Sequence, residues 1–278
     1  DMPQLNIVDG LEGEKDYEID DDPAKVTRLD LSSFAFVRAF EAVIPLFSLS
    51  VAYKVERFQF QEVLSAYIGT EPASRVLGGQ IRRGDVISRE SALGFADLRG
   101  FTAATESLEA GQLLDLVGSF FELVYEALDE VGGEILKFMG DGILAVFDQK
   151  TFGETAAANA AVKAAKAALE AIDELNRNPP EDLPDPIHWH PLKIGIGLHR
   201  GEVFFGNVGG EERLDFTVIG RAVNETSRVE SLCKPLGRAL LLTEPVRAAL
   251  SGDLQTGLNA MGEHALRGVG KPVAIFAA

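Results

Sequence analysis

The spacing of apolar positions predicts alternating helices and strands from residue 91 to the C-terminus. A helix is predicted over 108–131, because apolar residues recur there every three or four positions: Leu113, Leu116, Val117, Phe120, Val124, Leu128 and Val131. Two short apolar runs, 135–139 and 143–147, flank Gly140-Asp141-Gly142. An Asp-Gly pair between two such runs favours a β-hairpin. The hairpin would place Asp141 at its tip.

The same reasoning yields the order of the other elements. They are a strand at 93–96, an Ala-rich helix at 154–177, a hairpin of 192–198 and 203–208 that turns at Arg200-Gly201, a strand at 214–219, a helix at 222–233, a strand at 239–242, a helix at 244–250, and strands at 256–260 and 273–276. Strand, helix, hairpin, helix and strand form the split order of a ferredoxin-like sheet. We therefore predict an α+β, ferredoxin-like (β-α-β-β-α-β) domain with its helices on one face and a helical N-terminal extension.

The N-terminal third has a different pattern. Residues 1–30 are acidic and lack the apolar surface that ordering requires, so we expect a flexible segment. Residues 31–67 are densely apolar and predict one or two helices broken near Pro45, followed by a Gly-containing connector. Such helices need cover from the main domain or from a second copy of themselves. We interpret 31–90 as a signal transducer or dimerisation element and 91–278 as the main folded domain.

Composition and charge narrow the class of protein. Hydrophobic residues make up 46% of the 278 and charged residues 25%, as in ordinary globular proteins. The net charge of −17 argues against nucleic acid as a partner, because phosphate backbones are bound by clustered Lys and Arg. Arg38 and Glu41 interrupt the apolar N-terminal stretch, so no membrane insertion is expected.

The single cysteine and the first residue of the chain bear on the cellular compartment and on the extent of the whole protein. Cys233 is the only cysteine, so no intrachain disulfide can form, which suits a reducing cytoplasm. We see no signal peptide. The chain starts at Asp1 rather than Met, which is compatible with a fragment of a longer protein that carries an upstream sensor domain.

Two aspartates are the main candidates for chemistry. Asp97 ends the strand at 93–96, and Asp141 would be its neighbour if the two strands pair. Close carboxylates repel unless cations neutralise them, and oxygen ligands suit two Mg²⁺ or Mn²⁺ ions per site. The turn of Gly100, Phe101 and Thr102 after Asp97 would offer N–H groups to phosphate oxygens. The alternative is two unrelated surface acids.

Lys137 is a cation within a run that otherwise reads as a buried strand. An unpaired buried charge is costly, so Lys137 needs a partner, and a ligand would serve. Alternatively, its stem lies along the surface while its ammonium reaches water.

Three linked motifs resemble the catalytic signature of class III nucleotidyl cyclases, in order and at the expected spacing from residue 91 onward. They are Phe95-Ala96-Asp97-Leu98-Arg99-Gly100-Phe101-Thr102, Lys137-Phe138-Met139-Gly140-Asp141, and Phe216-Thr217-Val218-Ile219-Gly220 with Val223-Asn224 and Arg228. Because position 217 is a Thr, the chain resembles the Thr-bearing, class IIIb-like subgroup of adenylyl cyclases. The resemblance implies an adenylate cyclase that converts ATP to 3′,5′-cyclic AMP and pyrophosphate in intracellular signalling.

The resemblance also implies a role for each matching position. The metal ligands would be Asp97, Asp141 and the Leu98 carbonyl. Lys137 and Thr217 would read the adenine ring. Asn224 would orient the ribose, and Arg228 would stabilise charge on the α-phosphate. An in-line attack by the 3′-hydroxyl needs positioning and charge neutralisation of this kind. A Lys donor and a Thr acceptor match N1 and N6 of adenine, so we expect ATP to be preferred over GTP.

The resemblance implies a head-to-tail homodimer with shared sites, because family members divide these roles between two subunits. Three alternatives stay open. One is a catalytically silent, nucleotide-binding regulatory domain, and another is a guanylate cyclase. The third is a diguanylate cyclase, since Gly132-Gly133-Glu134 is similar to the signature of that class, although Ile-Leu-Lys follows it here.

Overall fold

The computed structural model describes residues 16–20, 26–30, 34–79, 82, 84, 86–179, 191–210 and 214–278, without the side chains before residue 42 and that of Glu71. The first 15 residues of the predicted flexible segment lie outside this range. The chain divides into two compact units, residues 1–63 and residues 64–278, each of which is described by itself.

The first unit contains a strand pair and most of a long helix. Strands β1 (Asp16–Asp20) and β2 (Val26–Asp30) form an antiparallel pair that the acidic composition did not predict. Helix α1 (Phe34–Ile68) continues into the second unit and contains Pro45, so the predicted break is wrong. A proline removes one backbone donor and can bend a long helix without ending it. No helix among the described residues is long and apolar enough to cross a membrane.

A mixed sheet forms the centre of the second unit. Its strands are β3 (Val86–Leu98), β4 (Glu134–Met139), β5 (Gly142–Asp148), β6 (Ile194–Gly209), β7 (Leu214–Ile219), β8 (Leu240–Thr243), β9 (Asn259–His264) and β10 (Val273–Ala277). The order is β4-β5-β3-β6-β8-β10-β9, and β7 pairs with β6. Strands β4, β5, β3 and β6 are antiparallel neighbours, which confirms the ferredoxin-like arrangement.

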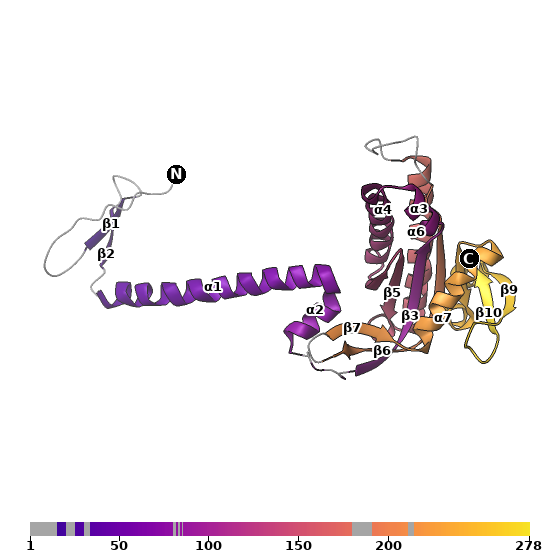
Figure 1. Cartoon of the computed structure of the whole chain (residues 1–278). Helices are drawn as coiled ribbons and strands as arrows, with labels where there is room; N and C mark the ends of the chain where they lie inside the picture. The colour runs from indigo at the N-terminus through magenta and orange to yellow at the C-terminus, as the bar shows by residue number, and fades with distance from the viewer. Residues whose placement is uncertain are drawn as a thin grey trace. The chain divides into compact units, whose positions relative to one another are not determined.

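Helices cover both faces of this sheet (Figure 1). The helices that begin at or after Thr70 are α2 (Thr70–Leu77), α3 (Phe101–Ser107), α4 (Ala110–Asp129), α5 (Gln149–Phe152), α6 (Glu154–Arg177), α7 (Arg221–Ser231), α8 (Cys233–Leu236), α9 (Glu244–Ala249) and α10 (Asp253–Thr256). Helices α4 and α6 enclose the main core on one face, where small residues of α6 allow close approach. Helix α7 packs against the other face, with Ala222 and Val223 beside Val203 and Phe205. The sequence predicted helices on one face only.

The second predicted hairpin is wrong, because β6 runs without a turn through Arg200 and Gly201. It pairs with β3 along its length, from Leu98 opposite Ile194 to Val86 opposite Gly206. A Cβ at Gly201 would lie 3.0 Å from Ala222 Cβ. The glycine therefore allows α7 to approach the strand rather than allowing the chain to turn.

Candidate functional site

Two carboxylates lie at the end of the central strand pair. Asp97 is opposite Gly142 in the β3–β5 ladder, and Asp141 occupies the turn before β5, after Gly140 with φ +69°. The Leu98 amide donates to the Asp141 carbonyl across 3.3 Å, which joins the strand end to the turn. A Cβ at Gly142 would lie 2.8 Å from Phe95 Cζ and 3.1 Å from Asp97 Oδ1. The glycine thus leaves space beside the Asp97 carboxylate.

Burial and mutual repulsion perturb this group of acids. Burial, and then the neighbouring charge of Asp141, raise the pKa of Asp97 to about 6. On α7, burial and the charge of Asp97 raise the pKa of Glu230 to about 7, while Arg99 opposes the shift. No three His, Cys, Asp or Glu side chains among the described residues form a set that could hold a metal ion. Any cation at Asp97 and Asp141 would therefore take other ligands from backbone, water or a bound nucleotide.

Glu230 is a site residue that sequence reasoning missed. It lies two positions after Arg228, and the motif offered no reason to place an acid near Asp97. The close approach of α7 to β6 brings it there, since a Cβ at Gly195 would collide with Glu230 Oε1 and lie 3.1 Å from Arg99 Nη2. Arg99 Nη2 also donates to the Arg238 carbonyl across 2.7 Å.

Lys137 has a partner within the chain. Its Nζ lies 2.6 Å from Asp215 Oδ2 of β7, and the two side chains are 43% and 57% exposed. The prediction that this run forms a buried strand is therefore wrong, because the residues of β4 are exposed or half-buried. Lys137 is accessible, as the second alternative expected. Asp215 lies two positions before Thr217, and residues two apart on a strand share a face. That alternation was the sequence signal for Asp215.

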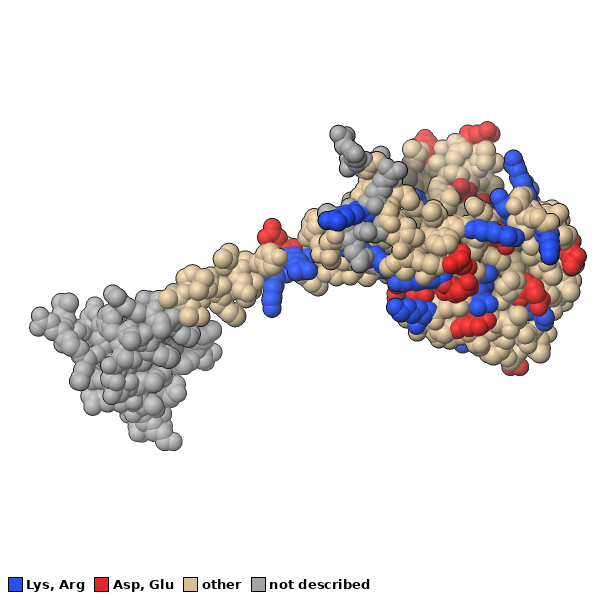
Figure 2. Space-filling model, turned by 90° about the horizontal axis from the view of Figure 1, so that it is seen from below, with Lys and Arg blue, Asp and Glu red and all other residues tan. Residues whose placement is uncertain are grey.

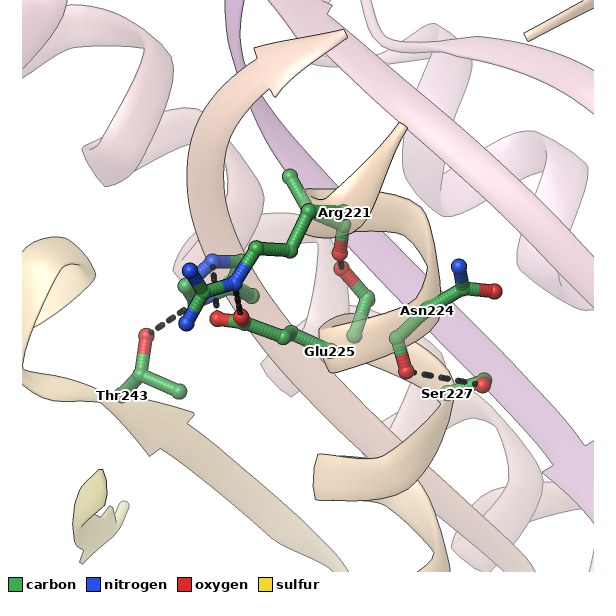
Figure 3. Close-up of polar contacts among 8 residues, drawn as sticks. Arg221, Asn224, Glu225, Ser227 and Thr243 are labelled. Atoms are coloured by element: carbon green, nitrogen blue, oxygen red, sulfur yellow. Dashed lines mark hydrogen bonds and ion pairs between the residues drawn. The ribbon is translucent and has the colours of Figure 1, made fainter. Parts of the chain in front are cut away.

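Asn224 and Arg228 lie four residues apart on α7. Asn224 is exposed, and Figure 3 shows its amide directed away from Glu225. The backbone carbonyl of Asn224 accepts a hydrogen bond from Ser227 Oγ at 3.2 Å. The Arg228 guanidinium lies beside the turn between β9 and β10, where a Cβ at Gly268 would be 3.6 Å from both of its terminal nitrogens.

A polar network that is buried at His199, Glu225 and Thr243 fixes α7 to the sheet (Figure 3). Glu225 accepts from Arg221 Nε and lies 3.2 Å from His199 Nε2 of β6. His199 Nδ1 lies 2.9 Å from Thr243 Oγ1, and each of the His199 and Glu225 side chains is 8% exposed. A carboxylate only accepts, so Nε2 carries the proton that faces Glu225. Burial lowers the pKa of His199, and the Glu225 charge opposes that shift.

The predicted phosphate-binding turn directly follows Asp97 and Leu98. Gly100 adopts φ +81° and precedes α3, whose N-terminus has no side-chain cap. A cavity of about 160 Å³ opens beside Leu98, Arg99, Gly100 and Phe101. Phe101 packs partly against the core, and the Thr102 carbonyl accepts from Thr105 Oγ1. The Leu98 side chain is buried, so this residue can serve the site only through its backbone.

The structure thus brings the predicted residues into three local groups. These are the Asp97–Asp141 pair, Lys137 with the strand that carries Thr217, and the Asn224–Arg228 pair on α7. The roles of these residues in binding and catalysis stay predictions.

Comparison with known proteins relates the chain to adenylate and guanylate cyclases. The profile of the family described as "Adenylate and Guanylate cyclase catalytic domain" matches residues 88–277. A relative from Anabaena cylindrica named adenylate cyclase is 36% identical over 176 residues, which cover 62% of this chain and 33% of the relative. The chain therefore spans about a third of that relative's length.

Two solved structures show the extent of the structural likeness. The structure of a bacterial light-regulated adenylyl cyclase has a TM-score of 0.68 and 24% identity, and the alignment covers 84% of this chain and 62% of that one. At this identity the likeness concerns the fold. The crystal structure of the guanylyl cyclase Cya2 has a TM-score of 0.56 and 29% identity, with coverage of 69% and 92%.

Proposed function

The chain belongs to the family of adenylate and guanylate cyclase catalytic domains, and on this premise we propose that it is an adenylate cyclase. It would convert ATP to 3′,5′-cyclic AMP and pyrophosphate. The observation that carries the proposal is the Asp97–Asp141 pair at the ends of adjacent strands, where Asp141 helps to raise the pKa of Asp97.

The acidic pair fits a divalent cation site. Hard oxygen donors suit Mg²⁺ or Mn²⁺, and the raised pKa of Asp97 reflects a charge repulsion that cations would relieve. We propose that Asp97, Asp141 and the Leu98 carbonyl hold two such ions. Bound ions would neutralise the triphosphate and favour ionisation of the attacking 3′-hydroxyl. Backbone N–H groups at Gly100, Phe101 and Thr102 would bind phosphate oxygens.

The remaining roles fall to residues of β4, β7 and α7. We propose that Lys137 and Thr217 read the adenine edge, and that Asn224 orients the ribose. Arg228 would stabilise the charge that develops on the α-phosphate. Such stabilisation of developing charge is usually the largest single contribution to the rate enhancement. The exposed amide of Asn224 is free of the Glu225 network and is therefore accessible to a nucleotide.

We propose that two copies assemble head to tail and share two equivalent sites. The metal-binding residues of one subunit would then meet the base-reading and transition-state residues of the other. Mixing an Asp141→Ala chain with an Arg228→Ala chain tests this arrangement, because one of the two mixed sites keeps both intact halves. Activity should recover on mixing, and no recovery despite demonstrated subunit exchange would contradict shared sites.

The decisive assay is turnover of ATP and GTP by the purified chain with Mg²⁺ and then Mn²⁺. Cyclic AMP and pyrophosphate should form, with ATP preferred, and Asp97→Ala should abolish the reaction. A folded dimer that forms cyclic GMP preferentially would favour the guanylate cyclase alternative. Nucleotide binding without product under either metal would favour a silent regulatory domain.

We further propose that α1 is a dimerisation element. Residues 42–53 carry no charge, and large apolar side chains there are exposed in the single chain, including Leu46 at 68%, Phe47 at 68% and Leu49 at 69%. Figure 2 shows this stretch as a mostly tan rod, whereas charges of both signs are interspersed on the visible face of residues 64–278. A second α1 would cover these side chains and link the extension to cyclase activity.

A further inference from the structure

The ion pair between Lys137 and Asp215 joins two segments that lie 78 residues apart in sequence. Lys137 belongs to β4 and Asp215 to β7, and their charged atoms lie 2.6 Å apart. Exposed ion pairs of this kind contribute little to stability. The pair is therefore poorly explained as a structural support, and it holds one of the two residues proposed to read the base.

Lysine needs such a partner if it is to discriminate between bases. Its ammonium stands on a flexible four-carbon stem, and all three hydrogens are donors. A free ammonium can therefore donate to N1 of adenine or equally well to O6 of guanine. A carboxylate at 2.6 Å restricts the position of Nζ and takes one of its donors.

Thr217 matches the adenine amino group when its hydroxyl accepts, but by itself it does not exclude guanine. A hydroxyl donates or accepts according to how it rotates, so it can serve the amino group of adenine or the carbonyl of guanine. Asp215, by contrast, only accepts when it is ionised. Among Lys137, Thr217 and Asp215, the aspartate is thus the one group whose hydrogen-bonding character favours one base over the other.

We propose that Asp215 is a positioning residue that sets the preference for ATP over GTP. It acts through Lys137, whose Nζ it directs toward N1, and its negative charge beside the base edge favours the adenine amino group and repels guanine O6. Asp215 and Thr217 share one face of β7, so both lie on the side from which Lys137 approaches. The inference rests on the proposed cyclase function and deepens it.

The test is Asp215→Asn in the full chain, with kcat/KM measured for ATP and for GTP under one metal. Asparagine keeps the shape but removes the charge and adds a donor. The ratio of the two kcat/KM values should fall by about tenfold or more, through a loss with ATP and a gain with GTP, mainly in KM. Asp215→Glu should restore part of the ratio.

Glu244→Gln is the matched control. Glu244 is 42% exposed and lies 2.6 Å from Arg247 on α9, so the change removes an ion pair of similar exposure elsewhere. Its ratio should equal that of the unaltered chain. Unequal folding is checked by comparing thermal unfolding of all variants.

An unchanged ratio in Asp215→Asn would overturn the proposal. If the KM for ATP also fell while the ratio stayed unchanged, Asp215 would merely compete with nucleotide for Lys137. If the unaltered chain forms no cyclic product, the proposed function fails. Displacement of a bound fluorescent ATP analogue by ATP and by GTP then measures the ratio of the two affinities.

Discussion

Gly197→Ala should displace α7, the helix that carries Asn224 and Arg228, while the strands of the sheet stay paired. Gly197 lies opposite Phe95 in the β3–β6 ladder. A Cβ there would lie 2.8 Å from both Glu230 Cα and Thr226 O, and closer still to Glu230 N. All three atoms belong to the backbone of α7, so no side-chain rotation can relieve the contact.

The size of the effect follows from these distances. Ordinary contact begins near 3.4 Å, so relieving the two 2.8 Å contacts requires a movement of about 0.6 Å, and relieving the closer contact with Glu230 N requires more. Overpacking of this kind costs about 1–3 kcal/mol, and a misplacement of about 1 Å can lower a rate about 100-fold. We expect the free energy of unfolding to fall by about 2 kcal/mol and cyclase kcat to fall about 30- to 100-fold.

Gly94→Ala is the matched control, because Gly94 lies opposite Leu198 in the same ladder. Its Cβ would meet only side-chain atoms, Leu198 Cδ2 at 3.3 Å and Ala145 Cβ at 4.0 Å. Both changes also reduce the entropy of the unfolded chain alike. Urea unfolding followed by far-UV circular dichroism and a cyclic nucleotide assay measure the two effects. If Gly197→Ala matches Gly94→Ala in both, the reasoning about α7 is wrong.

Three further predictions concern pH, metal and assembly. Asp97 and Glu230 have raised pKa values in the folded chain, so their protonation adds to the free energy of unfolding. This contribution is fully present below about pH 4 and is lost as the pH rises through 6 to 7. Mn²⁺ should therefore raise the Tm more at pH 8 than at pH 5.5, and Asp97→Asn should abolish this difference. The lowered pKa of His199 means that its contribution is present above about pH 6.5 and is lost in acid. Glu225→Gln lowers that pKa further, so its deficit in urea unfolding, about 1–2 kcal/mol at pH 8, should grow at pH 5.5. Leu46→Ser with Leu49→Ser should weaken dimerisation in analytical ultracentrifugation, whereas Leu114→Ser, which is 72% exposed on α4, should not.

Each of these predictions has a contrary outcome. An equal Mn²⁺ effect at both pH values would mean that protons and metal do not compete at Asp97. A Glu225→Gln deficit independent of pH would remove His199 from the explanation. Equal dimerisation of the α1 variant and its control would mean that the exposed side chains of α1 do not hold the dimer together.

The local elements of the site were accessible from the sequence because short-range physics sets them. Asp141 follows Gly140 and precedes Gly142, and such a turn needs only neighbouring residues to form. Asp97 lies next to the last residue of β3 and three positions before Gly100, and a strand followed by a Gly-containing turn is also a local signal. The order of strands and helices then predicted the ferredoxin-like arrangement, since few sheet topologies accept it.

Other features depended on segments that meet only in the folded chain. Gly201 read as a turn because glycine marks turns, but here it accommodates Ala222 of α7 within a continuous strand. Glu230 gains its raised pKa from burial beside Asp97, and Lys137 gains Asp215 from a different strand. Desolvation and charge act through space, so they depend on which surfaces pack together. The sequence by itself therefore determined the local turns, most of the helices and strands, and the residues of the three motifs. The tertiary structure decided where a glycine fits a neighbouring helix instead of a turn, and which charges face one another.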